Sequence, residues 1–175
     1  MPKASYLFSG RVKNQWLAGL QAIAVAAVVC LSTTTAGATE ASAAAAADQA
    51  PIVRTEIKDR AAYNRLLSNS GISLQWLWTD ARGQVDAVND NGVLRLTGGH
   101  STSEGELEID GEVVSISADR FIFRGTILIL DAPDLGRRCE RHGDFEFRAT
   151  GKRKYWRLQQ MEACDGLTDY VDIYY

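Results

Sequence analysis

The sequence predicts an all-β, mainly antiparallel protein: a small up-and-down barrel or sandwich of about eight to ten short strands with one N-terminal helix. Three observations lead to this prediction. Apolar residues alternate with a period of two from residue 72 to the C-terminus, glycines interrupt the alternation at turn-like intervals, and one segment alone shows convincing helical periodicity. Short strands with frequent turns are typical of barrels and sandwiches.

Composition excludes several classes of protein. Of 175 residues, 46% are hydrophobic and 23% are charged, which argues against a disordered chain and against a polytopic membrane protein. The formal net charge of -3 excludes a globally basic nucleic-acid binder, so we expect no nucleic-acid partner.

Residues 1–38 have the pattern of a signal peptide. Basic residues (Lys3, Arg11 and Lys13) precede an apolar run over residues 16–31, and Ala36-Gly37-Ala38 offers an Ala-x-Ala cleavage site. The apolar run is shorter than the roughly 20 residues of a membrane span, so we expect no stable membrane span after cleavage. These features predict a periplasmic or secreted protein.

The mature chain is predicted to contain one domain. Residues 39–53 are rich in alanine and predict a disordered spacer, in which further cleavage sites follow Ala43 and Ala47. Residues 54–175 are long enough for a single domain with its own core, and we expect a monomer.

Cleavage removes Cys30 and leaves Cys139 and Cys164 in an oxidising compartment, which predicts one disulfide between them. In the chain-entropy model this link stabilises the fold by about 3 kcal/mol. The same cysteines with His142 and Asp165 are an alternative zinc site, but oxidation favours the disulfide, and we expect neither metal nor cofactor.

The helix is expected over residues 55–67. Thr55 is the expected N-cap, acidic residues follow in the first turn, and Gly71 comes after the end. Its apolar stripe predicts a structural lid on the sheet.

Strands are then expected from Ile72 onwards, beginning with residues 72–78. Asn89-Asp90-Asn91-Gly92 is a strong hairpin signal, and Asp110-Gly111 predicts a second hairpin turn. Glycines such as Gly125 are expected at further turns.

The single helix, the segment Gly71-Ile-Ser-Leu-Gln-Trp76 and the hairpins that follow resemble the calycins, the lipocalin-type small barrels. The lipocalin signature has Gly-x-Trp, whereas four residues separate Gly71 from Trp76 here. The resemblance covers most of the mature chain at the level of architecture. It implies a barrel that holds one small apolar ligand.

A basic and aromatic segment near the C-terminus predicts contacts to an anionic ligand, because rings stack on ligands while Arg and Lys pair with negative charge. Its members are Arg148, Lys152, Arg153, Lys154, Tyr155, Trp156 and Arg157. Trp76 and Trp78 are expected to add apolar contacts. In the alternative interpretation Trp156 and Leu158 enter the core and the basic tip is merely solvated.

Charge is unevenly distributed along the chain. Residues 104–119 hold six acidic and no basic side chains, while residues 137–157 hold eight basic side chains against three acidic ones. We expect these segments to pair across one sheet and neutralise each other. The alternative is steering of a charged partner.

The sequence does not predict an enzyme. Gly98-Gly-His100-Ser101 differs from a Gly-x-Ser-x-Gly nucleophile elbow, and adjacency does not make His100 a base for Ser101. No carboxylate pair stands in an apolar context that would raise a pKa for acid catalysis.

Two functions follow as hypotheses. The first is an exported soluble barrel that binds a small apolar or anionic ligand. The second is a protein-interaction module, such as an inhibitor of a secreted hydrolase or an envelope assembly factor, whose partner is an envelope protein. The C-terminal segment 169–175 also resembles the closing strand of bacterial outer-membrane barrels, which suggests an organism with two envelope membranes.

Overall fold

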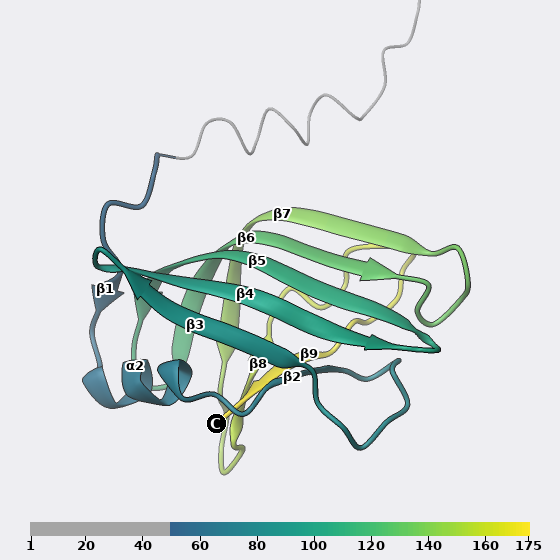
Figure 1. The fold of residues 1–175 in the computed structure, drawn as a ribbon, viewed down its shortest axis with the longest axis horizontal. Helices are drawn as coiled ribbons and strands as arrows, with labels where there is room; N and C mark the ends of the chain where they lie inside the picture. Colours follow the sequence, from purple (N-terminus) through teal and green to yellow (C-terminus); the bar gives the residue numbers. More distant parts are fainter. Residues whose placement is uncertain (1–49) are drawn as a thin grey trace, which may run out of the picture. The chain divides into compact units, whose positions relative to one another are not determined.

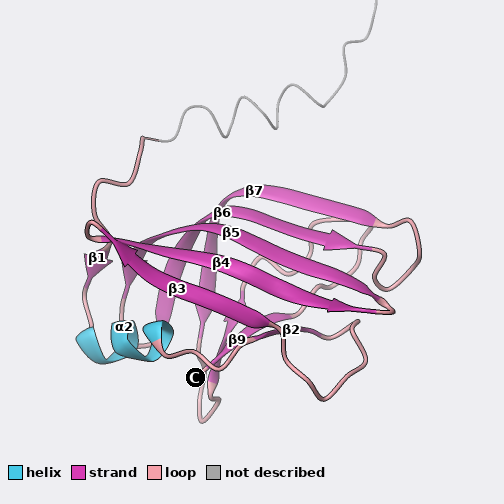
Figure 2. Ribbon diagram, viewed as in Figure 1, coloured by secondary structure: helices cyan, strands magenta, loops and turns pink. Residues whose placement is uncertain are grey.

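The computed structural model describes residues 50–175, so the predicted signal peptide (1–38) and most of the predicted spacer (39–53) lie outside the described residues. In chain order the elements are β1 (Glu56–Ile57), α2 (Arg60–Leu67), β2 (Ile72–Leu74), β3 (Gln84–Asp90), β4 (Val93–Thr102), β5 (Gly105–Ile116), β6 (Arg120–Leu130), β7 (Arg138–Arg148), β8 (Tyr155–Leu158) and β9 (Val171–Tyr174) (Figures 1 and 2). No helix in this part of the chain has the length and apolar character needed to cross a membrane.

The strands form a nearly closed barrel. Eight of them pair antiparallel in the order β2-β9-β8-β7-β6-β5-β4-β3, and β1 adds to β5 in parallel. The two outermost strands meet at one bridge, where Ile72 and Gly83 exchange backbone hydrogen bonds of 3.1 and 2.9 Å. This architecture confirms the predicted fold class and the barrel shape implied by the resemblance.

The two ends of the barrel differ in what covers them. At one end, called the helix end, α2 lies beside the turns at residues 91–92 and 149–154. At the other, called the loop end, lie the loops 75–83, 103–104, 131–137 and 159–170 (Figure 1).

Apolar side chains fill the helix end. Phe121 stacks on Phe147 with ring centroids 4.9 Å apart, and Trp156 meets Phe121 edge-on at 5.6 Å. All three side chains are fully buried, and Leu66 of α2 packs into the same core. Burial of each such side chain contributes about 1.5–3 kcal/mol, so this end supplies much of the driving force for folding.

The helix begins later than predicted. Its N-cap is Asp59, whose carboxylate accepts from the Ala62 backbone N–H at 2.6 Å. Thr55 has a different role, because its buried hydroxyl donates to the Val113 carbonyl (2.7 Å) and accepts from the Leu94 amide (2.8 Å). Residues 56–57 are extended because they pair with β5. The prediction was therefore wrong at this boundary.

One hairpin prediction is confirmed and one is wrong. Asn91-Gly92 turns with φ of 52° and 94°, as a tight hairpin requires. By contrast, β5 runs unbroken through Asp110-Gly111, and β6 runs unbroken through Gly125. These glycines permit close approach of the two strands, because a Cβ at Gly111 would lie 2.2 Å from the Arg124 carbonyl oxygen. The central strands are consequently longer than predicted.

Among the described residues the acidic and basic segments contact each other through one ion pair, Asp119–Arg148 (3.6 Å), and they do not pair as neighbouring strands. The acidic segment forms β5, the basic segment forms β7 and β8, and β6 lies between them. Ion pairs form locally, as between Arg95 and Glu112 (2.9 Å) or Arg124 and Asp144 (2.6 Å). Acidic side chains of β5 therefore stay on the outer surface.

Candidate functional site

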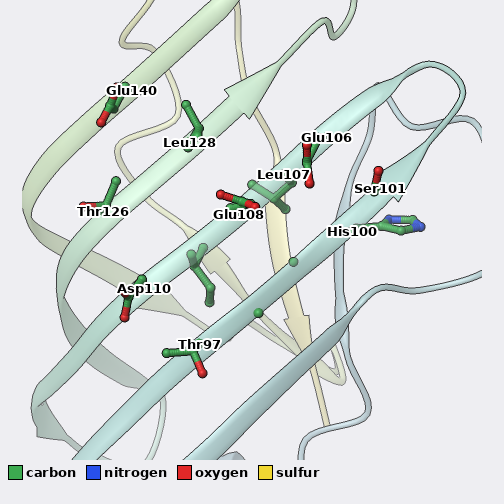
Figure 3. A pocket seen from close by; sticks show the side chains of 13 residues that line it. Thr97, His100, Ser101, Glu106, Leu107, Glu108, Asp110, Thr126, Leu128 and Glu140 are labelled. Atoms are coloured by element: carbon green, nitrogen blue, oxygen red, sulfur yellow. The ribbon is translucent and has the colours of Figure 1, made fainter.

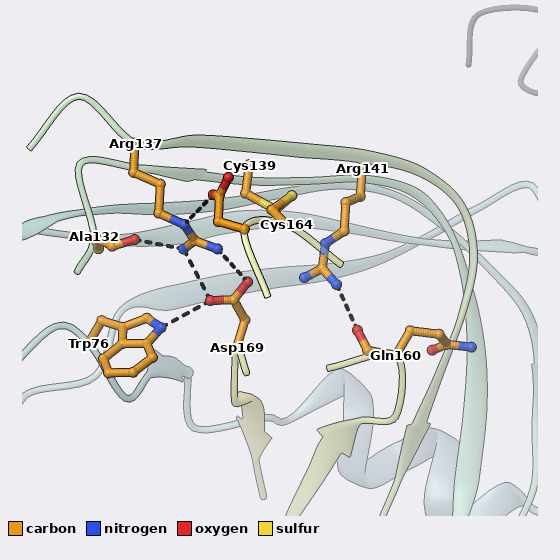
Figure 4. The surroundings of a disulfide bond; sticks show 9 residues. Trp76, Ala132, Arg137, Cys139, Arg141, Gln160, Cys164 and Asp169 are labelled. Carbon is orange, nitrogen blue, oxygen red and sulfur yellow. Dashed lines mark hydrogen bonds and ion pairs between the residues drawn. A yellow bond between two sulfur atoms is a disulfide. The ribbon is translucent and has the colours of Figure 1, made fainter. Parts of the chain in front are cut away.

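The loop end contains a buried ion pair between Arg137, just before β7, and Asp169, just before β9 (Figure 4). Two guanidinium nitrogens donate to the two carboxylate oxygens at 3.1 and 2.9 Å. The side chains are 5% and 0% exposed. The Trp76 indole N–H donates to the same carboxylate at 3.0 Å. The pair thus joins loops 75–83, 131–137 and 159–170.

Neighbouring acids keep Arg137 charged. Burial alone lowers the pKa of Arg137, but hydrogen bonds and attraction from Asp169 and Asp165 outweigh burial and raise that pKa. Besides its hydrogen bonds to Asp169 and Asp165, the guanidinium donates to the Ala132 carbonyl at 2.7 Å, which fixes its position further. The charge of Arg137 is therefore compensated within the chain.

A disulfide anchors the loop 159–170 to β7. Cys139 and Cys164 are joined with an S–S distance of 2.00 Å and a Cα–Cα distance of 5.8 Å, which confirms the predicted link. Because the bridge consumes both thiols, the alternative zinc site is wrong. Within residues 50–175, no group of three or more His, Cys, Asp or Glu side chains is placed to hold a metal ion.

Arg141 is the least compensated charge at this end. It follows Cys139 by two residues, so it lies on the inward face of β7, opposite Ile127 of β6. Its Nη1 donates to the Gln160 carbonyl at 2.7 Å, and the Phe145 ring centroid lies 5.8 Å from its Cζ. Its Nε and Nη2 are buried and have no hydrogen-bond partner in the described part of the chain.

The electrostatics of Arg141 reflect this position. Burial lowers its pKa, attraction to Asp169 opposes the decrease, and repulsion from Arg137 adds to it. A buried cation with unsatisfied donors is costly for the folded state. Stability therefore does not explain why an arginine stands here.

His100 is a second buried polar residue of the loop end. It lies on the inward face of β4, is 8% exposed, and its Nδ1 has no partner among residues 50–175. Burial lowers its pKa, so the imidazole is neutral at pH 7. The register places it in one row with Leu107, Ile129 and Cys139. Ser101 lies on the opposite face of the strand, away from this imidazole.

The two tryptophans predicted as ligand contacts are separated. The predicted strand 72–78 ends at Leu74, and both rings lie in the following segment. Trp76 is partly buried, and its indole N–H donates to Asp169. It therefore belongs to the polar cluster of the loop end, which comprises Arg137, Asp169, Arg141 and His100. Trp78 is 77% exposed in loop 75–83.

The predicted cations are spread over another part of the molecule. Arg148 lies 3.6 Å from Asp119, and Arg157 makes two 2.7 Å hydrogen bonds to Asp172. Residues 152–154 (Lys152, Arg153 and Lys154) are exposed at the hairpin tip of the helix end.

The aromatic residues of that hairpin pack against other side chains of the protein. Trp156 is fully buried in the core of the helix end. The Tyr155 ring lies 5.3 Å from the ring of Tyr174. The structure therefore does not gather the predicted contact residues into one site, and of these residues Trp76 belongs to the polar cluster.

A groove of 640 Å³ crosses the outer face of β4, β5, β6 and β7 (Figure 3). Its charged residues are all acidic: Glu106, Glu108, Asp110 and Glu140. Thr97 and Thr126 add hydroxyl groups beside them. This groove could attract a cationic partner, and its lining also includes His100.

Sequence reasoning missed Arg137, Arg141 and Asp169. One signal was available for Arg141: strand alternation from the disulfide-forming Cys139 puts residue 141 on the same inward face. A charged residue at such a position is unusual and marks a candidate site. Asp169 lies in a loop, where no periodicity reveals burial.

Comparisons with known proteins place the chain in a family. The sequence model described as "PM1083 family" matches residues 54–175, and the chain belongs to this family. A relative from Pasteurella multocida (strain Pm70), named "Uncharacterized protein PM1083", is 38% identical over 114 residues, which cover 64% of this chain and 74% of the relative. No solved structure matches the chain significantly.

Proposed function

We propose that this member of the PM1083 family is an exported binding protein that holds a small ligand at the loop end of its barrel. One observation supports this proposal above others. The side chains of Arg137, Asp169 and His100 and the Nε and Nη2 atoms of Arg141 are buried at this end, whereas the helix end is mainly apolar, with Trp156 Nε1 and Arg65 Nε as its buried atoms without a partner among residues 50–175. Buried charges are often no more stabilising than apolar residues of similar volume, so a ligand is the better reason for the cluster.

The loop end also has the rigidity that a binding site needs. The disulfide, the Arg137–Asp169 pair and the Arg141 contact to Gln160 all hold loop 159–170 against β7. A preorganised site loses less conformational entropy when it binds. The disulfide also suits an oxidising compartment, in agreement with the predicted export.

The proposal narrows the mode of binding implied by the calycin resemblance. Aromatic rings occupy the interior of the helix end, so the ligand is expected near the mouth formed by the loops. Binding without catalysis remains the expectation, because the inward His100 and the outward Ser101 do not form a nucleophile–base pair.

Native mass spectrometry tests this function. The full chain is expressed with its own leader and recovered from the periplasm, and its mass is measured under native and then denaturing conditions. We expect extra mass in the native spectrum that disappears on denaturation. A native mass equal to that of the mature chain alone would contradict a carrier function, if protein purified from the source organism gives the same result.

A second candidate function is a protein-interaction module. Two observations favour it: the exposed basic tip at residues 152–154 and the acidic outer groove. Both are charged surfaces that could steer a partner.

Replacement of Lys152, Arg153 and Lys154 by serine tests this second function. Loss of a co-purifying envelope protein would support it, provided that Lys58→Ser, at an exposed lysine outside both surfaces, leaves the protein bound. Unchanged recovery of that partner with the serine variant would argue against a role for the tip.

A further inference from the structure

We propose that the ligand of the loop end carries a carboxylate group, and that Arg141 binds this group side-on through Nε and Nη2. The inference rests on the proposed binding function and specifies its ligand class. The juxtaposition that supports it is a guanidinium with one nitrogen bonded to the protein and another edge, Nε and Nη2, that is buried without a partner among residues 50–175.

The geometry of the guanidinium defines the free edge. Nη1 is occupied by the Gln160 carbonyl at 2.7 Å. Nε and Nη2 are buried without partners in the part of the chain that the structure describes. The N–H groups of Nε and Nη2 on one side of a guanidinium are parallel, and they match the two oxygens of a carboxylate. The chain therefore leaves open the edge that is suited to bidentate recognition.

Charge favours a monoanion. The two buried cations, Arg137 and Arg141, share one fully buried carboxylate, Asp169, which bonds Arg137 directly. Asp165, the other acid beside Arg137, is 62% exposed and its charge is largely screened. The positive charge of Arg141 is thus only partly compensated, by Asp169, and one further carboxylate would neutralise it. A phosphate dianion would leave an excess negative charge in a partly buried site.

The surroundings of Arg141 include a glycine with open space beside it and an aromatic ring. Gly143 follows Arg141 by two residues, and a Cβ built there would meet no heavy atom of the described chain within 4 Å beyond its neighbours in sequence. Pairing of β8 with β7 is confined to Phe147–Leu158 and Arg148–Arg157. The first part of β7 therefore contacts loop 159–170 in place of β8, through Cys164 and the Gln160 carbonyl. The Phe145 ring beside Arg141 favours an organic acid with an apolar body.

The experiment is a titration of the oxidised full chain with butanoate and benzoate, followed by the ¹⁵N resonance of the Arg141 Nε–H. This resonance is identified by its loss in Arg141→Lys, which keeps the charge but removes the planar fork. We expect the acids to shift it, while benzamide and inorganic phosphate do not. Affinity for the acids should fall about tenfold or more in Arg141→Lys.

Arg138→Lys is the matched control, because Arg138 lies on the same strand with an outward, largely exposed side chain paired to Glu140. It should bind the acids as the unmodified chain does. Three results would overturn the inference: no shift with any acid, equal binding of benzamide or phosphate, or unchanged affinity in Arg141→Lys. Because the shift is read in the unmodified chain, poor folding of a variant does not remove the test.

Failure of this inference is distinguishable from failure of the proposed function. A ligand that is released in native mass spectrometry but has no acid group would overturn the carboxylate and leave the binding function standing. A chain without extra mass that also fails to respond to acids would overturn both.

Discussion

The two ends of the barrel use the same strands for different purposes. At the helix end, inward positions of β6, β7 and β8 hold Phe121, Phe147 and Trp156, which stack in an apolar core. At the loop end, the inward face of β7 holds Cys139 and Arg141. Because neighbouring positions on one strand face share similar geometry, this difference comes from side-chain choice rather than from backbone architecture.

The comparison separates stability from the proposed binding function. Apolar burial drives folding at both ends, and the loop end is held in addition by specific links: a disulfide, an ion pair and hydrogen bonds. Substitutions at the two ends should therefore differ in the property they change, and four predictions test this.

The largest effect is expected at the helix end. Trp156→Ala removes a fully buried indole from an aromatic cluster and should lower the free energy of unfolding by about 3–5 kcal/mol. Urea unfolding monitored by circular dichroism measures this change. Trp78→Ala, at a ring that is 77% exposed, should change stability by less than about 0.5 kcal/mol. Similar losses in the two variants would contradict the assignment of the core.

A slightly smaller loss of stability is expected at the loop end when the ion pair is broken. Asp169→Ala leaves Arg137 buried without its main partner and should cost about 3 kcal/mol. The double variant Arg137→Met with Asp169→Leu should recover most of this loss, because it removes both charges. Thermal unfolding compares the stability of the two variants. If the double variant is the less stable one, the pair itself is stabilising.

Arg141→Met should change stability little, and in the favourable direction. It replaces an incompletely bonded buried cation with an apolar side chain, which should raise the free energy of unfolding by about 1 kcal/mol or leave it unchanged. Binding of carboxylic acids should be lost at the same time. A large loss of stability in urea unfolding would show that Arg141 is a structural residue.

The smallest effect concerns pH. Burial lowers the pKa of His100 in the folded state, so the unfolded chain binds this proton more readily. Stability should therefore be highest above about pH 6.5 and decline as pH falls toward 5. His100→Gln should flatten this slope in unfolding experiments at pH 7, 6 and 5.

His142→Gln is the control for that measurement, because the His142 side chain is 38% exposed. It should leave most of the slope in place. The stability change between pH 6.5 and 5 lies above the pH range in which Asp119 and Glu140 take up protons, because hydrogen bonds from Arg120 and Arg138 lower the pKa values of these carboxylates. An unchanged slope in His100→Gln would show that another group takes up the proton.

Much of the fold was predictable because local sequence patterns determine it. Period-two alternation predicted the strands, Asn91-Gly92 predicted a hairpin, and the parity of cysteines after export predicted the disulfide. The errors arose where long-range contacts override local signals. Thr55 bonds backbone groups of β4 and β5 in place of capping the helix, and Gly111 serves close strand approach in place of a turn.

The candidate site was less accessible to sequence reasoning. The basic and aromatic residues of the hairpin at 148–157 were predicted as ligand contacts because they are adjacent in sequence. Arg137, Arg141 and Asp169 come together only because loop 159–170 folds back onto β7. Such a cluster depends on tertiary structure, and no single segment of the chain contains it.

The bridge between Ile72 and Gly83 gives the barrel a seam. Parting the barrel there breaks two backbone hydrogen bonds, together with side-chain links such as the one from Asn69 to the Val85 carbonyl. Parting β5 from β6 would break a ladder of ten residue pairs. The wall is therefore easier to open between β2 and β3, beside the loop that carries Trp76, than between β5 and β6. Opening at this seam would give a ligand a route through the side of the barrel to the loop end, while the disulfide holds loop 159–170 against β7.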